Sequence, residues 1–380
     1  MIAIIAGSNN GKEARSAGRA SPERAAGDLQ KQFTGAKILY EPRFDTFRPR
    51  IREQVELSKT NWFRVGGLAE FVFRPQDAQD LAAFFRLLPH DVPVTVLGVG
   101  SNVIVRDGGI DGVVIKLGRG FAGITVGEAE SRSAGRASVA SQRMRCDAQL
   151  NENGPPAAGQ PASWREQQAN DGGNTIIAGG GALDVHVAAV ACAHGLSGLE
   201  FLCGIPGTIG GAVRMNAGAY GADISHVLKQ AQIVERNGII RMLTNKELGF
   251  VYRNSALPEG AVVTQALLFG IPGDKEGIQS RMNEISSARE GTQPVRSRTG
   301  GSTFKNPEGH KAWQLIEQAG CRGLRIGGAQ VSGQHCNFLI NTGDATAADL
   351  ENLGEEERKR VQEKTGILLE WEIKRIGKSS

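Results

Sequence analysis

The hydrophobic and polar positions of this chain follow two spacings. In several segments, apolar residues recur every three to four positions, which is the spacing of one face of a helix. In other segments, short apolar runs are bounded by glycine, proline or asparagine, which is typical of strands. The helical spacing covers residues 77–88, 183–194, 274–290, 311–319 and a long segment after Asp344. The strand-like runs cover residues 92–97, 113–117, 124–126, 175–178, 232–244, 261–269, 336–340 and 367–373.

Residues with known preferences for helix ends support these helices. Asp77 can cap the first helix and Pro89 ends it, because a carboxylate accepts the free amide hydrogens and proline cannot continue the helix. Gly195 and Gly320 stop the second and fourth helices. We expect Asp344 to cap the last one.

Two segments interrupt this pattern. Residues 7–36 and 128–174 are poor in aliphatic side chains, and both contain the heptad RSAGRAS. An identical low-complexity heptad in both indicates inserted sequence rather than a repeat fold. We expect the first to form a poorly ordered N-terminal arm. The second should hang from a hairpin between the strands at 124–126 and 175–178, because a long loop there adds little closure entropy.

The remaining pattern changes character near residue 272. Before it, strand-like runs predominate, and one of them contains Asn237-Gly238, a dipeptide that favours a tight hairpin turn. After Pro272, three predicted helices are combined with two predicted strands. The chain is therefore predicted to form two α+β units with a break at 270–274.

Composition narrows the class of protein. Lysine and arginine number 44 against 40 aspartate and glutamate, and aromatic residues make up 6%, so a nucleic-acid-binding surface has weak support. The five cysteines show no CxxC spacing and the histidines no ligand spacing, so we expect reduced thiols and no metal site. No apolar run has the length of a membrane span or of a signal segment. We therefore expect a soluble, cytoplasmic protein.

Two glycine-rich segments carry the candidate chemistry. The longer is FLCGIPGTIGGAVRMNAGAYG at Phe201–Gly221, and the shorter is LGVGSN at Leu97–Asn102, directly after a strand-like run. Glycine lets backbone amides approach a ligand, and Asn216 and Tyr220 can point polar groups toward it. LGVGSN is not a dinucleotide fingerprint of the Rossmann type, because Val103 stands where the third glycine should be. The alternative is that both segments only close the fold.

The order of the motifs resembles a known group of flavoproteins. FRVGG, LGVGSN, DGGIDGVVI, IIAGGGA and GIPGTIGGAV follow one another as in the flavin-binding domain of the vanillyl-alcohol oxidase superfamily. The later motifs VYRNS, GGSTFKNP, GGAQVSGQHCNFLIN and LEWEIKRIG are similar to the UDP-N-acetylenolpyruvoylglucosamine reductase family in particular. The resemblance runs from about Asn61 to Gly377, apart from the insert. Trp62 and Trp371 depart from it, standing where the family more often shows threonine and proline.

The resemblance implies an α+β fold. It would consist of a two-part FAD-binding domain of the vanillyl-alcohol-oxidase (PCMH) type and a smaller α+β substrate-binding domain. The implied divisions are an N-terminal arm at 1–44, the FAD-binding domain at 45–271, the substrate-binding domain at 272–366, and a C-terminal strand within 367–380 that returns to the active site.

The resemblance also implies an activity. Noncovalently bound FAD would be reduced by NADPH and would reduce the enolpyruvyl ether of UDP-N-acetylenolpyruvoylglucosamine to UDP-N-acetylmuramate for peptidoglycan synthesis. Hydride addition to the β carbon leaves negative charge at the α carbon and its carboxylate, so the site needs a cation and a proton donor. Arg253, Ser302 and Glu372 match the family's catalytic residues, with Ser302 protonating the α carbon. Their plainer alternatives are a surface arginine, a turn-capping serine and a glutamate on a solvated strand edge.

The binding residues follow from the same match. Cofactor contacts are expected from Gly98, Gly100, Ser101, Asn102, Gly204, Gly207, Thr208 and Gly211. Substrate contacts are expected from Arg214, Tyr220, Lys305, Asn306 and His335. Lys305 and Asn306 could instead cap a turn, and His335 could be a hydrogen-bonded structural residue.

Two other functions remain open from the sequence. An FAD-dependent carbohydrate or alcohol oxidase of the same fold would be reoxidised rapidly by oxygen and would not need NADPH. A colourless protein that binds nucleic acid through its Arg/Gly/Ser segments would show strongly salt-dependent binding. We expect the partners to be small molecules only, with no nucleic acid and no membrane insertion, and the protein to be a monomer.

Overall fold

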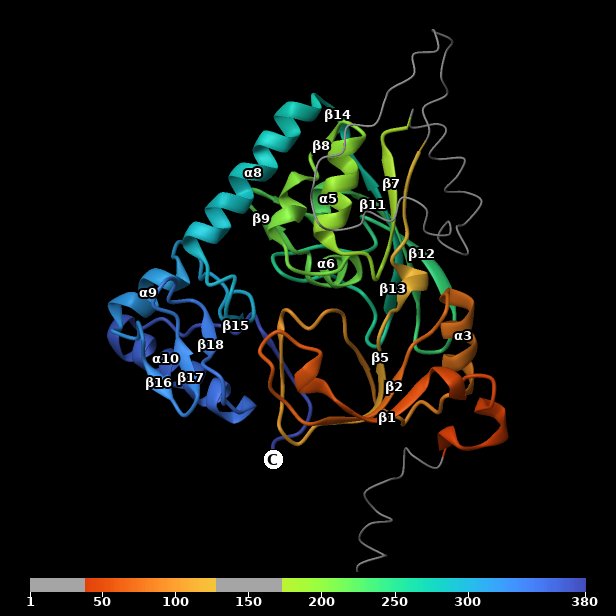
Figure 1. Ribbon diagram of the computed structural model, residues 1–380, viewed down its shortest axis with the longest axis horizontal. Coiled ribbons are helices and arrows are strands. Elements are labelled where there is room, and N and C mark those ends of the chain that lie inside the picture. Colours follow the sequence, from red (N-terminus) through yellow and green to blue (C-terminus); the bar gives the residue numbers. More distant parts are fainter. Residues whose placement is uncertain (1–37, 128–172) are drawn as a thin grey trace, which may run out of the picture.

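The structure, a computed structural model, describes residues 38–127 and 173–380 (Figure 1). Both RSAGRAS heptads lie outside the described residues, and so do the predicted N-terminal arm at 7–36 and nearly all of the predicted insert at 128–174. Residues 38–44, which the sequence assigned to the N-terminal arm, are packed into the fold, since Leu39 and Phe44 are buried beneath the first helix.

A four-stranded sheet forms the N-terminal part of the fold. Its strands lie in the order β1 (Ile51–Glu56), β2 (Leu68–Phe73), β5 (Ile110–Ile115) and β3 (Val94–Val96). β1 is antiparallel to β2, and the other neighbours are parallel. Helix α3 (Ala78–Leu87) packs on this sheet, where Phe84 stacks on Phe73 with 4.1 Å between ring centroids. Asp77 caps α3 as predicted, accepting a hydrogen bond from the amide of Asp80.

A five-stranded antiparallel sheet forms the middle of the fold. Its order is β12 (Ile240–Thr244), β11 (Leu228–Val234), β13 (Val262–Phe269), β7 (Thr175–Gly179) and β6 (Ile124–Val126). β6 and β7 pair with each other, so the strands that flank the expected insert do form a hairpin. The predicted hairpin at Asn237-Gly238 joins β11 to β12. Helices α5 (Asp184–Ala193) and α6 (Ile209–Met215) contribute to the largest buried core, which lies against this sheet.

Several short elements connect these layers. They are the strands β8 (Leu196–Ser197), β9 (Gly218–Ala219), β10 (Ala222–Asp223) and β14 (Ile271–Pro272), the helix α7 (Ile224–Val227), and the 3-10 helices η1 (Pro42–Phe44), η2 (Arg48–Arg50), η3 (Leu57–Lys59), η4 (Arg119–Phe121) and η5 (Glu200–Gly204).

The C-terminal unit is reached through the long helix α8 (Lys275–Thr292), which extends from the middle layer to the blue part of Figure 1. This unit has a small antiparallel sheet in the order β15 (Arg298–Thr299), β18 (Leu339–Asn341), β17 (Ala329–Val331) and β16 (Arg325–Ile326). Helices α9 (Ala312–Gln318) and α10 (Ala347–Thr365) pack with it around a separate core.

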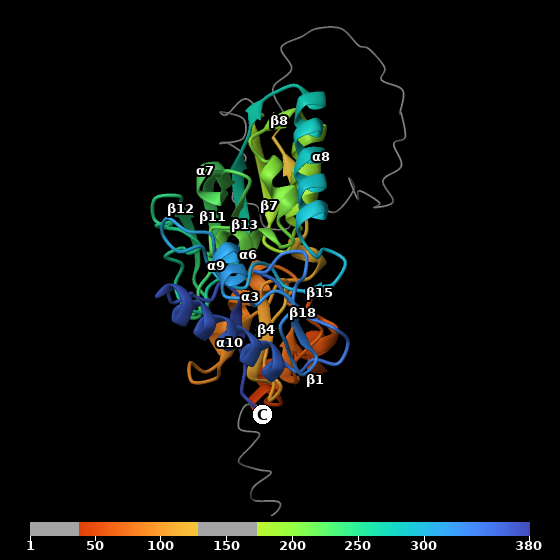
Figure 2. The same ribbon diagram turned by 90° about the vertical axis from the view of Figure 1, so that its left-hand side faces the viewer.

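The end of the chain returns to the N-terminal part. β19 (Lys374–Ile376) pairs in parallel with β4 (Val103–Val105), the strand that follows LGVGSN. In Figure 1 the C-terminus accordingly lies below the orange segments rather than beside the rest of the blue unit, and in Figure 2 it lies below β4. This return brings the last residues to a glycine-rich loop that lies far away in the sequence.

Three predictions about element ends were wrong. Helix α10 is capped by Thr346, not Asp344, because Thr346 and Asp349 form a reciprocal capping box that satisfies two amides at once. The predicted strand at 336–340 begins only at Leu339. Residues 367–373 are not a strand, since the amide of Glu372 bonds to the carbonyl of Thr303 and regular pairing with β4 begins only at Lys374.

No helix among residues 38–127 and 173–380 is both long enough and apolar enough to cross a membrane.

Candidate active site

A cavity of about 390 Å³ lies where the two glycine-rich segments meet. Gly98 and Val99 border it from LGVGSN, and Thr208 and Gly211 border it from the start of α6. Gly180, which directly follows β7, completes this wall. The two glycine-rich segments therefore border one cavity.

These segments can approach one another because their glycines have no side chains. A Cβ atom on Gly98 would lie 3.0 Å from Oγ1 of Thr208, and one on Gly180 would lie 2.0 Å from the carbonyl oxygen of Val263. The amide of Gly210 donates to the carbonyl of Gly180 at 2.8 Å, so it is used within the protein rather than offered to a ligand. Backbone atoms and small side chains thus form much of the cavity wall, which suits close contact with a planar or phosphate-bearing group.

Two cationic side chains also line the cavity. Burial lowers the pKa of Lys116, with the charge of Arg74 adding to the effect, and burial also lowers the pKa of Arg214. Arg214 donates through Nη1 to the carbonyl oxygens of Leu257 and Pro258. Glu259 is the acidic residue on the lining. Positive charge beside a glycine-rich wall favours an anionic ligand such as a dinucleotide.

The other predicted cofactor residues lie outside this lining. The Cβ position of Gly204 faces the ring of Tyr220, and that of Gly207 lies 2.7 Å from Oδ2 of Asp184. Gly100 has a φ of +70° and lies against Asn61, next to Ser101.

Asn102 connects the cavity wall to the end of the chain. Its side-chain amide donates to the carbonyl of Glu372 at 3.3 Å, and its own carbonyl accepts from the amide of Lys374 at 3.1 Å. One short loop, LGVGSN, therefore borders the cavity at its start and contacts Glu372 at its end.

Arg253 and Glu372 form an ion pair at this junction. Nε of Arg253 lies 3.0 Å from Oε1 of Glu372, without the alignment of a hydrogen bond, and both side chains are mostly buried. No described residue accepts a hydrogen bond from the terminal Nη atoms of Arg253, so these remain available to a ligand carboxylate. Burial raises the pKa of Glu372, and the positive charges of Arg253 and Lys305 oppose that rise.

Ser302 lies in the segment that contacts the same junction. The residue before it, Gly301, comes close to Asn102, and the residue after it, Thr303, accepts a hydrogen bond from the amide of Glu372 at 2.8 Å. Ser302 itself is half-buried. The three predicted catalytic residues therefore belong to segments that meet, although they are separated widely in the sequence.

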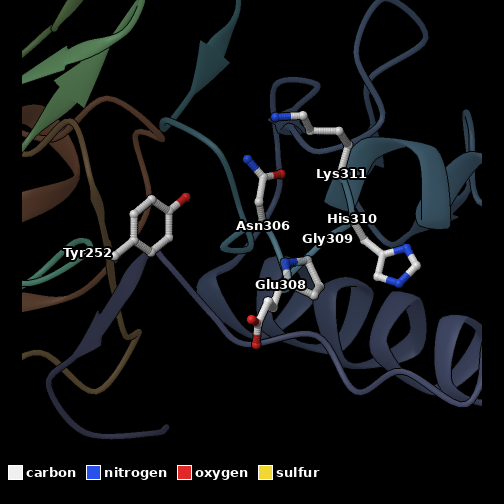
Figure 3. A pocket seen from close by; sticks show the side chains of 7 residues that line it. Tyr252, Asn306, Glu308, Gly309, His310 and Lys311 are labelled. Carbon is white, nitrogen blue, oxygen red and sulfur yellow. The ribbon is translucent and has the colours of Figure 1, made fainter.

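An open hollow of about 630 Å³ adjoins Tyr252, the neighbour of Arg253. Figure 3 shows Tyr252 on one side and Asn306, Glu308 and Lys311 on the other, with the ring of His310 turned away from Tyr252. The Asn306 side chain accepts a hydrogen bond at 3.0 Å from the amide of Ala312, the first residue of α9, so it contacts the start of a helix rather than capping a turn. Lys305 pairs with Glu370 and lies close enough to Glu372 to influence its pKa.

Two of the predicted substrate residues lie in different surroundings. Nδ1 of His335 accepts from the amide of Asn337, and its ring packs edge-on against Phe338 with 4.9 Å between centroids. These contacts fit the structural alternative for His335. Tyr220 has a φ of +54°, and burial raises the pKa of its hydroxyl, while the nearby charge of Arg289 opposes that rise.

Sequence reasoning missed two cations of this region. Lys116 follows an apolar strand, and Arg289 lies in a helix that is otherwise mostly exposed, so neither belongs to a glycine motif. Burial lowers the pKa of Arg289, and none of the ion pairs among the described residues involves it. The only feature of the sequence that could have indicated Lys116 is its position directly after an apolar strand.

Metal-ligating groups are not assembled in the part of the chain that the structure describes, where no three histidine, cysteine or acidic side chains are placed to hold an ion. The four cysteines described, Cys192, Cys203, Cys321 and Cys336, are buried free thiols.

Comparisons with known proteins agree with this geometry. Residues 69–140 and 164–244 match the family model of an FAD binding domain, and residues 293–376 match that of the UDP-N-acetylenolpyruvoylglucosamine reductase C-terminal domain. The UDP-N-acetylenolpyruvoylglucosamine reductase of Gluconobacter oxydans is 51% identical, over 88% of this chain and 94% of that protein. That of Parvibaculum lavamentivorans is 50% identical, over 87% of this chain and 93% of its own length.

A solved structure extends the comparison to the fold. The crystal structure of UDP-N-acetylenolpyruvylglucosamine reductase from Thermus caldophilus aligns with a TM-score of 0.65 at 31% identity, covering 86% of this chain and all of that one. The family resemblance, the α+β fold class and the FAD-binding domain expected from the sequence are confirmed. The chain belongs to the UDP-N-acetylenolpyruvoylglucosamine reductase family of FAD-dependent oxidoreductases.

Proposed function

We propose that this protein uses NADPH to reduce the enolpyruvyl group of UDP-N-acetylenolpyruvoylglucosamine, giving UDP-N-acetylmuramate. The observation that carries the proposal is the Arg253–Glu372 ion pair, 3.0 Å long, at the junction of LGVGSN, GGSTFKNP and the C-terminal segment. Relatives that are more than 45% identical over most of the chain are named UDP-N-acetylenolpyruvoylglucosamine reductase, which supports the same substrate.

The residues of the glycine-lined cavity fit an FAD group. Gly98, Thr208 and Gly211 offer a close wall, while Lys116 and Arg214 supply positive charge for its phosphates. When bound, FAD would accept a hydride from NADPH and deliver it to the β carbon of the enolpyruvyl group. The Gly98–Asn102 loop would bind the flavin ring of FAD, because this loop extends from the cavity to Glu372.

Arg253 and Ser302 would complete the reaction on the substrate. Hydride addition at the β carbon moves an electron pair onto the α carbon and its carboxylate, and the free Nη atoms of Arg253 would stabilise that charge. Ser302 would give its hydroxyl proton to the α carbon, which leaves the lactyl ether. Glu372 would hold Arg253 through Nε, so that the terminal nitrogens face the substrate.

The substrate would extend over the second unit. Lys305 and Asn306 adjoin the junction, and the hollow beside Tyr252 is roomy enough for polar parts of the sugar nucleotide. Tyr220 stays a proposed substrate contact, whereas Arg214 is reassigned to the cofactor cavity that it lines and the contacts of His335 favour a structural role. The domain divisions at 272–366 and 367–380 stay as proposed, and residues 38–44 join the first domain, proposed at 45–271. We also propose that the protein acts in the cytoplasm as a monomer.

The test is the Ser302→Ala variant in anaerobic stopped-flow experiments. NADPH should still bleach the flavin at close to the wild-type rate, because Ser302 takes no part in that half of the cycle. Reoxidation by the enolpyruvyl substrate should slow by about 10²-fold or more, the usual effect of removing a positioned proton donor. Wild-type reoxidation in this variant would contradict the role assigned to Ser302.

A further inference from the structure

We propose that Asn216 is a positioning residue that fixes the turn carrying Arg253, and so determines where the guanidinium meets the substrate carboxylate. The inference rests on the proposed function, because that function gives Arg253 a carboxylate to bind. Asn216 lies in the glycine-rich segment, where its residue type suggested a group pointing toward a ligand. Its contacts assign it a different task.

The turn that carries Arg253 needs support from outside. Val251 and Asn254 exchange two backbone hydrogen bonds of 3.1 Å, so Tyr252 and Arg253 form the corner between them. Arg253 has a φ of +58°, in the left-handed region that favours glycine over a residue with a Cβ atom. A residue held in such a conformation persists only where surrounding contacts fix it, and such residues cluster at functional sites.

Asn216 supplies one of these contacts from a buried position. It ends α6 with a φ of +42°, and its side chain is almost completely inaccessible. Nδ2 donates to the carbonyl of Val251 at 3.2 Å, while Oδ1 accepts from the amide of Ser225 at 3.0 Å. One side-chain amide therefore joins the end of α6, the start of α7 and the first residue of the Arg253 turn.

Two further contacts from the same end of α6 hold the other side of the turn. Oγ of Ser255 donates to the carbonyl of Arg214 at 2.9 Å, and Arg214 in turn donates to the carbonyl of Leu257 at 2.9 Å. The opposite end of α6 begins after Thr208 and carries Gly211, both on the wall of the glycine-lined cavity. The single short helix α6 thus connects the cofactor cavity to the turn that carries Arg253, and Asn216 is the side chain that transmits its position to Val251.

Two variants separate this positioning from the helix-ending role of Asn216. Asn216→Gly keeps the left-handed backbone at the end of α6 but removes the amide. Asn216→Asp keeps an acceptor for Ser225 and removes the donor to Val251. Asn245→Ala is the matched control, because it deletes two 2.8 Å side-chain bonds, to the carbonyls of Ser225 and Leu228, without touching the Arg253 turn.

Half-reactions measured anaerobically give the first readout. Flavin content and reduction by NADPH should stay close to wild type in all three variants. Reoxidation by UDP-N-acetylenolpyruvoylglucosamine should fall by about 10- to 100-fold in Asn216→Gly and Asn216→Asp, since a displacement of about 1 Å in a positioned group has effects of that size. Asn245→Ala should reoxidise like wild type. Equal slowing in Asn245→Ala would overturn the proposal, because it would show a merely structural effect.

A double-mutant comparison tests whether Asn216 acts through Arg253. Adding Asn216→Gly to Arg253→Ala should slow reoxidation no further, because the group to be positioned is already absent. Independent, multiplying effects of the two substitutions would overturn the proposal.

Hydrogen exchange separates failure of this inference from failure of the proposed function. The amide hydrogens of Val251 and Asn254 should exchange faster in Asn216→Gly than in wild type or Asn245→Ala, whatever substrate the enzyme uses. Unchanged exchange at both amides would refute the anchoring by Asn216 itself. If exchange is faster in Asn216→Gly while the enolpyruvyl substrate fails to reoxidise even the wild-type enzyme, the anchoring by Asn216 stands and the proposed function alone fails.

Discussion

At the scale of single residues, the candidate chemistry depends on Arg253, whose guanidinium nitrogens have two different roles. Arg253 uses Nε to pair with Glu372 and keeps its terminal nitrogens free, in a strained turn held by α6. The sequence predicted the three catalytic residues from motif matches, and it offered a solvated strand edge as the alternative for Glu372. The structure places Glu372 in an irregular segment, mostly buried beside Arg253. Alternation along a supposed strand could not reveal that, because the segment bonds to Thr303 before it reaches β4.

The pH dependence of reoxidation should report the Arg253–Glu372 pair. Burial raises the pKa of Glu372, so the carboxylate takes up a proton at a higher pH than an exposed glutamate does. As the pH falls through that raised value, Arg253 loses its anionic partner and reoxidation by substrate should slow. Stopped-flow rates measured over about four pH units around neutral pH record this acid limb.

The Glu372→Gln variant provides the comparison for that profile. It should be slower by at least about 10-fold near neutral pH, and its remaining rate should show no acid limb from this group. The control is Glu363→Gln, which changes an exposed carboxylate on α10. An acid limb that persists unchanged in Glu372→Gln would contradict the role of the pair.

At the scale of elements, most helices and strands follow from the sequence because their ends carry strong local signals. Asp77 and Asp274 cap α3 and α8, and Gly320 follows α9 in the left-handed conformation. The start of α10 was misplaced because two candidate caps, Asp344 and Thr346, lie two residues apart. Only the reciprocal bonding of Thr346 with Asp349 decides between them.

The buried face of α10 carries a carboxyl group, although the run of acidic and basic residues at 355–360 is typical of a solvated helix face. Glu357 is fully buried, and neither of its carboxylate oxygens has a hydrogen-bond partner among the described residues. Burial raises its pKa well above the ordinary value. The same core contains Cys321, whose pKa burial raises to about 11, with Glu357 contributing.

The Glu357→Gln variant should change how stability depends on pH. The folded state keeps the Glu357 proton at pH values where the unfolded chain has lost it. The wild-type protein is therefore destabilised progressively as the pH rises from the ordinary glutamate range toward the raised pKa. The free energy of unfolding of Glu357→Gln should rise relative to wild type by up to about 1.4 kcal/mol per pH unit in that window.

Urea unfolding between acidic and neutral pH measures this difference. Glu363→Gln, on an exposed position of the same helix, is the matched control and should track the wild type. A Glu357→Gln difference that stays constant with pH would show that the carboxyl group does not remain protonated in the folded protein.

At the scale of the whole molecule, the site is assembled by the return of the chain. LGVGSN, the Arg253 turn, the Ser302 segment and the residues before β19 are separated by long stretches of sequence. The pairing of β19 with β4 and the hydrogen bond from Asn102 to Glu372 bring the end of the chain to LGVGSN. The order of motifs allowed the family, the fold class and the cofactor to be predicted. Local patterns could not predict which side chains support the site, since the hydrogen bond from Asn216 to Val251 and the place of Lys116 on the cavity wall depend on contacts between distant elements.

The most direct test of the account is the anaerobic reoxidation of the NADPH-reduced wild-type enzyme. We expect UDP-N-acetylenolpyruvoylglucosamine to restore the oxidised flavin spectrum in one rapid phase with formation of UDP-N-acetylmuramate, and oxygen alone to restore it far more slowly. Rapid reoxidation by oxygen, with no response to the enolpyruvyl substrate, would contradict the reductase function and favour an oxidase.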